Sequence, residues 1–214
     1  MRGQFIVVEG LEGAGKSTVI DTISQVLHEA GKSVVRTREP GGTPLAEALR
    51  DCVKKEWSES VTTTTELCLM YAARSQLLEN VITPALEQGQ WILADRHDWS
   101  SVAYQGGGRQ IPMDEIDSLR NITLKGVKPD FTILLDIDPE TGIKRASQRG
   151  ELDRIEQSGL LFFTRTRQKY LELAASHPDS SVVIDASQSI DEVQQDVLQA
   201  LHQYLGSEKD IDKI

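Results

Sequence analysis

The chain has little that would direct it to a membrane or to nucleic acid. None of the apolar runs in its 214 residues approaches the length that spans a bilayer. The first residues lead directly into an apolar run and leave no room for a signal peptide. The formal net charge of −10 argues against the basic face that nucleic acid and anionic membranes require. We therefore expect a cytoplasmic protein with small-molecule partners.

Cysteine is also scarce, because the sequence holds only Cys52 and Cys68. Their spacing fits no metal site, and both lie in apolar patterns typical of helices. We expect reduced thiols in or near the core, with a disulfide between them as the alternative. The sequence also shows no Ser-His-Asp set and no Cys/His cluster, which leaves hydrolytic and zinc chemistry without candidates.

What the sequence does contain is a phosphate-binding loop. Residues 10–17 read GLEGAGKS, two glycines five apart followed at once by lysine and a hydroxyl residue. An apolar run at 5–8 precedes the loop, and a helical pattern at 18–30 follows it. The residues expected to hold a nucleoside triphosphate are Gly10, Leu11, Glu12, Gly13, Ala14, Gly15, Lys16, Ser17 and Thr18. A glycine-rich turn that binds nothing is the alternative.

Strand and helix patterns alternate along the rest of the chain. Short β-branched runs at 5–8, 33–37, 91–94, 131–135 and 181–184 predict five strands. Because these runs lack polar alternation, we expect parallel strands buried on both faces by the helices between them. The pattern predicts a doubly wound α/β fold in a single domain over residues 1–206, followed by a frayed tail over 207–214. The run Thr62–Thr65 before Glu66 predicts a capped helix N-terminus.

Charged residues follow the apolar runs, at the strand ends where open parallel sheets bind ligands. Asp95 occupies the position of an acidic residue that holds magnesium, and a helix N-cap is the alternative role. Arg96 can bridge donor and acceptor phosphates, or it can be a structural partner of Glu9 or Glu39. We expect His97 to be a plain loop residue.

The segment 145–154 is typical of a mobile lid. Arg145 and Arg149 are four residues apart, so they can share one helical face, and Gly150 offers a hinge. Such a lid can close over a triphosphate, exclude water and neutralise charge. A solvated helix face with arginine–carboxylate pairs explains the same spacing equally well.

Six segments in a fixed order resemble bacterial thymidylate kinase. They are FIVVEGLEGAGKS at 5–17, TREPGGT at 37–43, YAAR at 71–74, DRH at 95–97, AYQGGGR at 103–109 and RGELDRIE at 149–156. The resemblance extends from residue 3 to about residue 204. It implies the P-loop kinase fold, a three-layer α/β/α sandwich with a five-stranded parallel sheet and a helical lid over about residues 142–156. It also implies ATP-dependent phosphorylation of dTMP to dTDP in dTTP synthesis, with Mg²⁺, by a cytoplasmic homodimer.

The same resemblance implies roles for individual residues. The residues expected to bind dTMP are Glu9, Arg38, Pro40, Met70, Arg74, Arg96, Ser101, Tyr104 and Gln105. Of these, Arg38 and Arg96 hold the phosphate, Arg74, Ser101 and Gln105 recognise thymine, and Tyr104 crowds out a 2′-hydroxyl. The expected catalytic residues are Lys16, Arg96, Arg149 and Arg154, and the expected metal ligands are Ser17 and Asp95. The loop has Glu12 where another subtype carries arginine, so the lid arginines would supply that charge.

One residue departs from the family pattern. The family usually has phenylalanine, stacked on thymine, where this chain has Met70. A thioether can cover a ring at a similar free energy, so we expect base binding to survive. Three other functions remain to be weighed: a kinase for another nucleoside monophosphate, a GTP-dependent switch and an inactive interaction module. Asn80 and Asn121 lack the lysine of a guanine-reading segment, and the retained Lys16 and Asp95 oppose an inactive module.

Overall fold

The computed structural model describes residues 2–148 and 150–211, without the side chains of residues 207–211. Its strands are β1 (Phe5–Gly10), β2 (Val34–Arg38), β3 (Trp91–Asp95), β4 (Phe131–Asp136) and β5 (Ser181–Asp185). They form one parallel sheet in the order β2-β3-β1-β4-β5. This confirms the predicted five-stranded sheet and places the strand before the phosphate loop at its centre.

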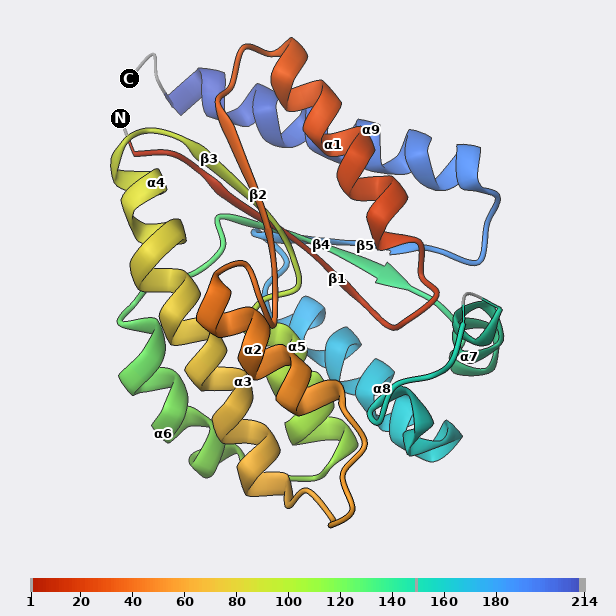
Figure 1. Cartoon of the computed structure of the whole chain (residues 1–214). Coiled ribbons are helices and arrows are strands. Elements are labelled where there is room, and N and C mark those ends of the chain that lie inside the picture. The colour runs from red at the N-terminus through yellow and green to blue at the C-terminus, as the bar shows by residue number, and fades with distance from the viewer. Residues whose placement is uncertain (1, 149, 212–214) are drawn as a thin grey trace.

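Helices cover both faces of this sheet (Figure 1). The α-helices are α1 (Lys16–Glu29), α2 (Pro44–Lys54), α3 (Thr63–Leu77), α4 (Thr83–Glu87), α5 (Asp98–Ser101), α6 (Met113–Leu124), α7 (Pro139–Ser147), α8 (Leu160–Ser176) and α9 (Ile190–Ile211). The shorter turns are two π-helical segments, η1 (Leu78–Ile82) and η2 (Val102–Gly108), and the 3₁₀ turn η3 (Glu156–Ser158). Helices α1 and α9 lie together on one face, and α2, α3, α5, α6 and α8 lie on the other. The predicted three-layer α/β/α sandwich is therefore confirmed.

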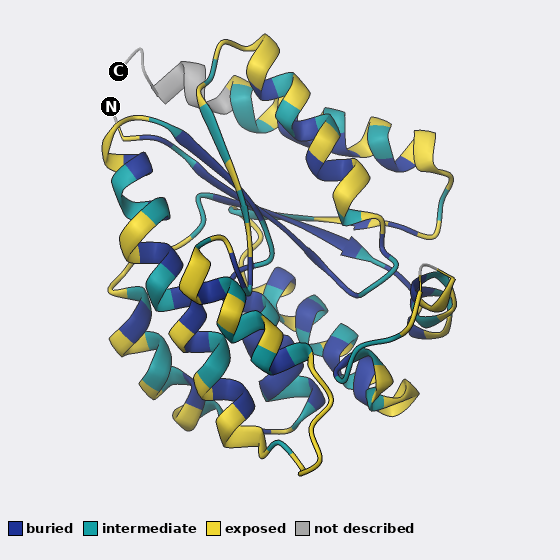
Figure 2. Ribbon diagram, viewed as in Figure 1, coloured by how far each residue is buried: buried dark blue, intermediate teal, exposed yellow. Residues whose placement is uncertain are grey.

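Burial differs between the centre and the edges of the sheet (Figure 2). All six residues of β1 are buried, and β3 and β4 are buried up to their last residues. The edge strands β2 and β5 are only partly covered, and Val183 of β5 is 46% exposed. The expectation of burial on both faces is therefore wrong for the edge strands, because the helical layers cover the middle of the sheet more fully than its margins.

Local signals set the helix boundaries. Thr62 Oγ1 accepts a hydrogen bond from the Thr65 amide at 3.1 Å, so the predicted cap of α3 is confirmed. Helix α9 runs to Ile211, five residues past the expected end of the domain at 206. No helix among the described residues is both long and apolar enough to cross a membrane.

The two cysteines are free thiols, but they do not both lie near the core. Cys52 is half-buried, whereas Cys68 is exposed. Cys68 and Ala72 lie one turn apart on the outer face of α3 and are both exposed, which the apolar pattern of the sequence does not reveal. The expectation of a near-core thiol is therefore wrong for Cys68.

Candidate active site

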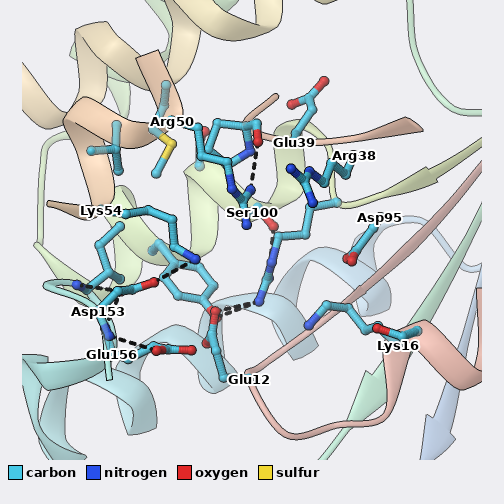
Figure 3. Close-up of a pocket in the computed structure, with 18 of the residues that line it drawn as sticks. Glu12, Lys16, Arg38, Glu39, Arg50, Lys54, Asp95, Ser100, Asp153 and Glu156 are labelled. Atoms are coloured by element: carbon cyan, nitrogen blue, oxygen red, sulfur yellow. Dashed lines mark hydrogen bonds and ion pairs between the residues drawn. The ribbon is translucent and has the colours of Figure 1, made fainter. Parts of the chain in front are cut away.

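A cavity of about 400 Å³ opens beyond the carboxyl ends of β1, β2 and β3. Fifteen of the residues predicted from the sequence line it: Glu12, Gly13, Gly15, Lys16, Ser17, Thr18, Arg38, Pro40, Met70, Arg74, Asp95, Arg96, Ser101, Tyr104 and Gln105. Figure 3 shows Lys16 and Asp95 on one side of the cavity and Lys54, Asp153 and Glu156 on the other. The fold therefore brings the predicted donor and acceptor residues into one space.

The phosphate loop forms one end of the cavity. Gly10 ends β1, where a Cβ atom would collide with the Leu135 carbonyl of β4. Gly15 precedes α1 at a φ of 88°, and no side chain caps the first amides of that helix. These amides and the positive end of the helix dipole form an anion site. Gly10 and Leu11 contribute their carbonyl oxygens, which accept hydrogen bonds from Lys16 Nζ at 3.2 and 3.0 Å.

The charge of Lys16 depends on its surroundings. Burial and the nearby Arg96 guanidinium lower the pKa of Lys16 to about 8, although the carboxylates of Asp95 and Glu12 oppose the shift. A bound phosphate would favour the ammonium form. Binding of a polyphosphate is therefore expected to take up a proton at alkaline pH.

Asp95 and Ser17 fit the expected magnesium site. Asp95 Oδ1 is buried and has no hydrogen-bond partner within the described part of the chain. A carboxylate oxygen of this kind suits a cation or one of its water ligands. Across the described residues no group of three or more His, Cys, Asp or Glu could hold a metal ion. Mg²⁺ commonly uses only one or two protein carboxylates, together with phosphate oxygens and water.

Arg96 lies between the two ends of the cavity. Its Nη2 is 2.7 Å from Glu12 Oε1 and donates to Tyr104 Oη at 3.1 Å. Tyr104 also donates to the second oxygen of Glu12. Although burial opposes it, the positive charges of Arg96 and Lys16 lower the pKa of Glu12, whereas burial raises that of Tyr104. Arg96 is thus paired with a carboxylate of the phosphate loop, not with Glu9 or Glu39.

Glu9 lies behind the cavity lining. It is fully buried and accepts hydrogen bonds from the His97 amide at 2.9 Å, Ser100 Oγ at 2.7 Å and Tyr170 Oη at 2.8 Å. Burial raises the pKa of Glu9, although Arg96 opposes the shift. Ser100 itself lines the cavity, so Glu9 can influence a bound ligand through its hydrogen bond with Ser100. Its direct contact with substrate stays a prediction.

A further arginine, which the sequence did not point out, lines the cavity beside Arg38. Arg50 on α2 donates from Nη1 to the Pro40 carbonyl at 2.7 Å, and Arg38 pairs with Glu47 at 2.8 Å. Burial lowers the pKa of Arg50, and the charge of Arg38 adds to this shift. The helical spacing of Glu47 and Arg50, three residues apart on α2, is the signal that could have found it.

The wall farthest from the phosphate loop contains a buried ion pair. Arg74 is 2% exposed, and its Nε lies 2.6 Å from Glu39 Oε2. Its Nη2 donates to Ser101 Oγ and to the His97 carbonyl, both at 3.0 Å. Its Nη1 has no hydrogen-bond partner among the described residues. That nitrogen lies 3.6 Å from Asp98 Oδ1, so Arg74 is paired with two buried carboxylates, Glu39 and Asp98.

His97 is not the plain loop residue that we expected. It is 1% exposed, and its Nδ1 lies 2.7 Å from Glu39 Oε1. Its ring meets the edge of Phe5 at a centroid distance of 5.0 Å. The sequence could not show this contact because Glu39 and His97 come from different strand ends.

The π-helical segment η2 supplies Tyr104 and Gln105. π-Helical turns are frequent at functional sites. Here both side chains line the cavity, as Ser101 does at the end of α5. Met70 faces the same cavity from α3, one turn before Arg74. The predicted base-binding residues therefore come from α3 and from the consecutive segments α5 and η2.

The expected lid is docked onto α2 and α3. Lys54 Nζ lies 3.0 Å from Asp153 Oδ2, Arg154 Nε donates to the Val53 carbonyl at 2.9 Å, and Arg154 Nη1 lies 2.8 Å from Glu66 Oε2. Arg154 is therefore held against α2 and α3 in this structure and is not among the residues that line the cavity. Its expected role at the triphosphate would require this segment to move. Arg149 lies outside the described residues.

A second cavity of about 320 Å³ lies on the other side of the phosphate loop. Gly13, Ala14, Gly15 and Thr18 line it together with Arg145, Ala186, Gln188, Ile190, Val193 and Gln194. Arg145 also lines the first cavity and donates to the Ala186 carbonyl at 3.0 Å. Sequence reasoning missed the contribution of residues 186–190. The rule that ligands gather at strand ends would have found it, because β5 ends at Asp185.

The family of the chain follows from comparison with known proteins. The family model described as "Thymidylate kinase" matches residues 8–197. The chain belongs to the thymidylate kinase family. The predicted family resemblance is therefore confirmed over most of the sequence.

Individual relatives agree with the family model. A thymidylate kinase of Alteromonas mediterranea is 55% identical over 210 residues, which cover 98% of this chain and 94% of that protein. A thymidylate kinase of Vibrio parahaemolyticus is 58% identical over 207 residues, covering 96% and 98%. The crystal structure of a thymidylate kinase from Ehrlichia chaffeensis matches at a TM-score of 0.76 with 29% identity, over 94% of this chain and 99% of that one.

Proposed function

We propose that this chain transfers the γ-phosphoryl group of ATP to the phosphate of dTMP and forms dTDP. Membership of the thymidylate kinase family supports this reaction. The observation that carries it is a single cavity in which Lys16 and Ser17 of the phosphate loop meet Arg38, Arg96 and Arg74.

The donor would occupy the phosphate loop and the second cavity. Loop amides and Lys16 would bind the β- and γ-phosphates, and the space between Arg145 and Gln188 would take the base. Asp95 and Ser17 would hold Mg²⁺, which supplies charge neutralisation for the transferring phosphate when it is bound.

The acceptor would place its phosphate at Arg38, Arg50 and Arg96 and its base near Arg74 and Gln105. Phosphate oxygens are already anionic at neutral pH, so the reaction needs no general base. Positioning and charge stabilisation carry the catalysis instead. Arg96 lines the cavity and donates both to Glu12 of the phosphate loop and to Tyr104 of η2. From this position its guanidinium can stabilise negative charge on the phosphoryl group during transfer between donor and acceptor.

Two further properties are part of the proposal. We place the enzyme in the cytoplasm, which its two free cysteines support.

We also propose a homodimer, for which the 71% exposed Ile122 on α6 offers apolar surface. Sedimentation at several concentrations would measure this, and a mass that stays at 23.7 kDa would contradict it.

A panel of nucleoside monophosphates tests the reaction. With ATP and Mg²⁺, we expect turnover of dTMP to exceed that of dCMP, AMP and GMP, and chelation of Mg²⁺ to abolish it. Equal turnover across the panel would assign the chain to another monophosphate kinase activity. Lys16→Ala run beside the parent separates catalysis from background hydrolysis.

A further inference from the structure

Glu66 is a buried carboxylate that the reaction above does not use. It lies in the first turn of α3, and only 1% of its surface is exposed. Three side chains from other segments contact it, namely Gln105 of η2, Arg109 after η2 and Arg154 of the lid. A buried carboxylate with two arginine partners is held as an anion, since either arginine would otherwise be left without its countercharge.

The contact with Gln105 fixes the orientation of an amide. Glu66 Oε1 lies 2.9 Å from the amide group of Gln105. An ionised carboxylate can only accept hydrogen bonds, so the nitrogen end of that amide must face it. The oxygen end then points the other way. Gln105 Oε1 has no donor among the described residues, and Gln105 lines the cavity beside Ser101 and Arg74.

An amide held in this orientation distinguishes two kinds of pyrimidine. Its free oxygen accepts a hydrogen bond from the ring N–H that thymine and uracil carry at N3. Cytosine presents a lone pair at the same position, which would face the amide oxygen and repel it. We propose that Glu66 is a positioning residue that makes the site selective for bases with an N3–H, by holding Gln105 with its oxygen toward the base. This inference rests on the proposed dTMP kinase function.

Arg109 and Arg154 hold Glu66 in place. Arg109 donates from Nε and Nη2 to the two oxygens of Glu66, both at 3.1 Å, and Arg154 Nη1 lies 2.8 Å from the second oxygen. Because Arg154 belongs to the lid and also binds the Val53 carbonyl, the docked lid helps to fix the carboxylate that orients Gln105. The carboxylate of Glu66 thus takes part both in base selectivity, through Gln105, and in lid docking, through Arg154.

The variant Glu66→Gln tests the proposal. A glutamine at 66 can donate as well as accept, so the Gln105 amide is free to turn over. We expect the ratio of kcat/KM for dTMP to that for dCMP to fall by at least about tenfold. The ratio for dTMP to dUMP should stay within about twofold, because both substrates carry the N3–H. Both ratios are measured on one preparation, so a loss of folded enzyme cancels.

Two controls separate positioning from a structural role. Glu79→Gln removes an exposed carboxylate paired with Lys125, and both ratios should stay at the parent values. In a Gln105→Ala background, adding Glu66→Gln should leave the dTMP to dCMP ratio unchanged within about twofold, because Glu66 acts through Gln105. A further fall of about tenfold in that background would overturn the proposal.

The outcomes are distinct. A parent enzyme that fails to phosphorylate dTMP defeats the proposed function, whereas an unchanged dTMP to dCMP ratio in Glu66→Gln defeats only this inference. Should Glu66→Gln fail to fold, the parent still provides a test by NMR. The side-chain amide protons of Gln105, identified by their loss in Gln105→Ala, should exchange slowly with water because they bind a buried carboxylate. Exchange at the rate of a free amide would overturn the proposal.

Discussion

The two ends of the cavity are built in different ways. The donor end consists of consecutive residues 10–18, whose backbone groups form the binding surface, and Ser17 and Thr18 are exposed. The acceptor end is built from side chains, which are buried where the base is expected, and the Arg74–Glu39 pair there joins residues that are far apart in the sequence. A backbone cradle depends on local conformation, whereas a buried network depends on every charged partner being present.

The largest effect is expected when the donor end loses the ammonium group of Lys16. Lys16→Ala removes the ammonium group from the phosphates, and we expect kcat for dTDP formation to fall about 10³-fold. The affinity for dTMP, measured by calorimetry, should stay within about threefold, because Lys16 lies at the donor end. A comparable loss of dTMP affinity would show that the two ends do not act separately.

Breaking the buried network should cost stability instead. Glu39→Gln leaves Arg74 and His97 without their common carboxylate, and the free energy of unfolding should fall by about 3–5 kcal/mol. The exposed pair provides the control, since Glu47→Gln beside Arg38 should cost about 1 kcal/mol or less. Urea unfolding measures both variants. Equal losses would contradict the distinction between a buried and an exposed pair.

The pH dependence should also differ between the two ends. Lys16 has its pKa lowered to about 8, so above that pH the empty site holds a neutral amine that must gain a proton when phosphate binds. The dissociation constant of a non-hydrolysable ATP analogue should therefore rise about tenfold between pH 7 and pH 9. The dTMP phosphate meets arginines, which stay charged in this range, so its affinity should be nearly constant. Calorimetry measures the dissociation constant of each ligand separately. A dissociation constant for the ATP analogue that does not change between pH 7 and pH 9 would contradict this prediction.

The smallest effect is expected at Met70. Replacing it with phenylalanine exchanges a thioether contact for aromatic stacking of about the same free energy, near 1 kcal/mol. Turnover of dTMP by Met70→Phe should stay within about tenfold of the parent. A hundredfold loss would mean that the base pocket of this chain is shaped differently from the family pattern.

The sequence predicted the phosphate loop with its flanking strand and helix, because these residues are contiguous, but it missed residues 186–190 of the second cavity. It also predicted the five strands, since apolar β-branched runs are local signals. It did not predict the pairing of Arg96 with Glu12, the burial of His97 or the docking of Arg154 on Glu66. Each of these contacts joins segments that only the folded sheet and its helices bring together.

The position of β1 at the centre of the sheet also governs when the protein can fold during synthesis. Phe5 pairs with Ile92 of β3, and Ile6 pairs with Phe131 of β4. During synthesis, β1 therefore lacks one of its two sheet neighbours until β4 has been made. Contacts between such distant segments slow folding and keep apolar surface exposed in the meantime. The strand before the phosphate loop is therefore the one whose apolar side chains stay exposed for longest while the chain is being made.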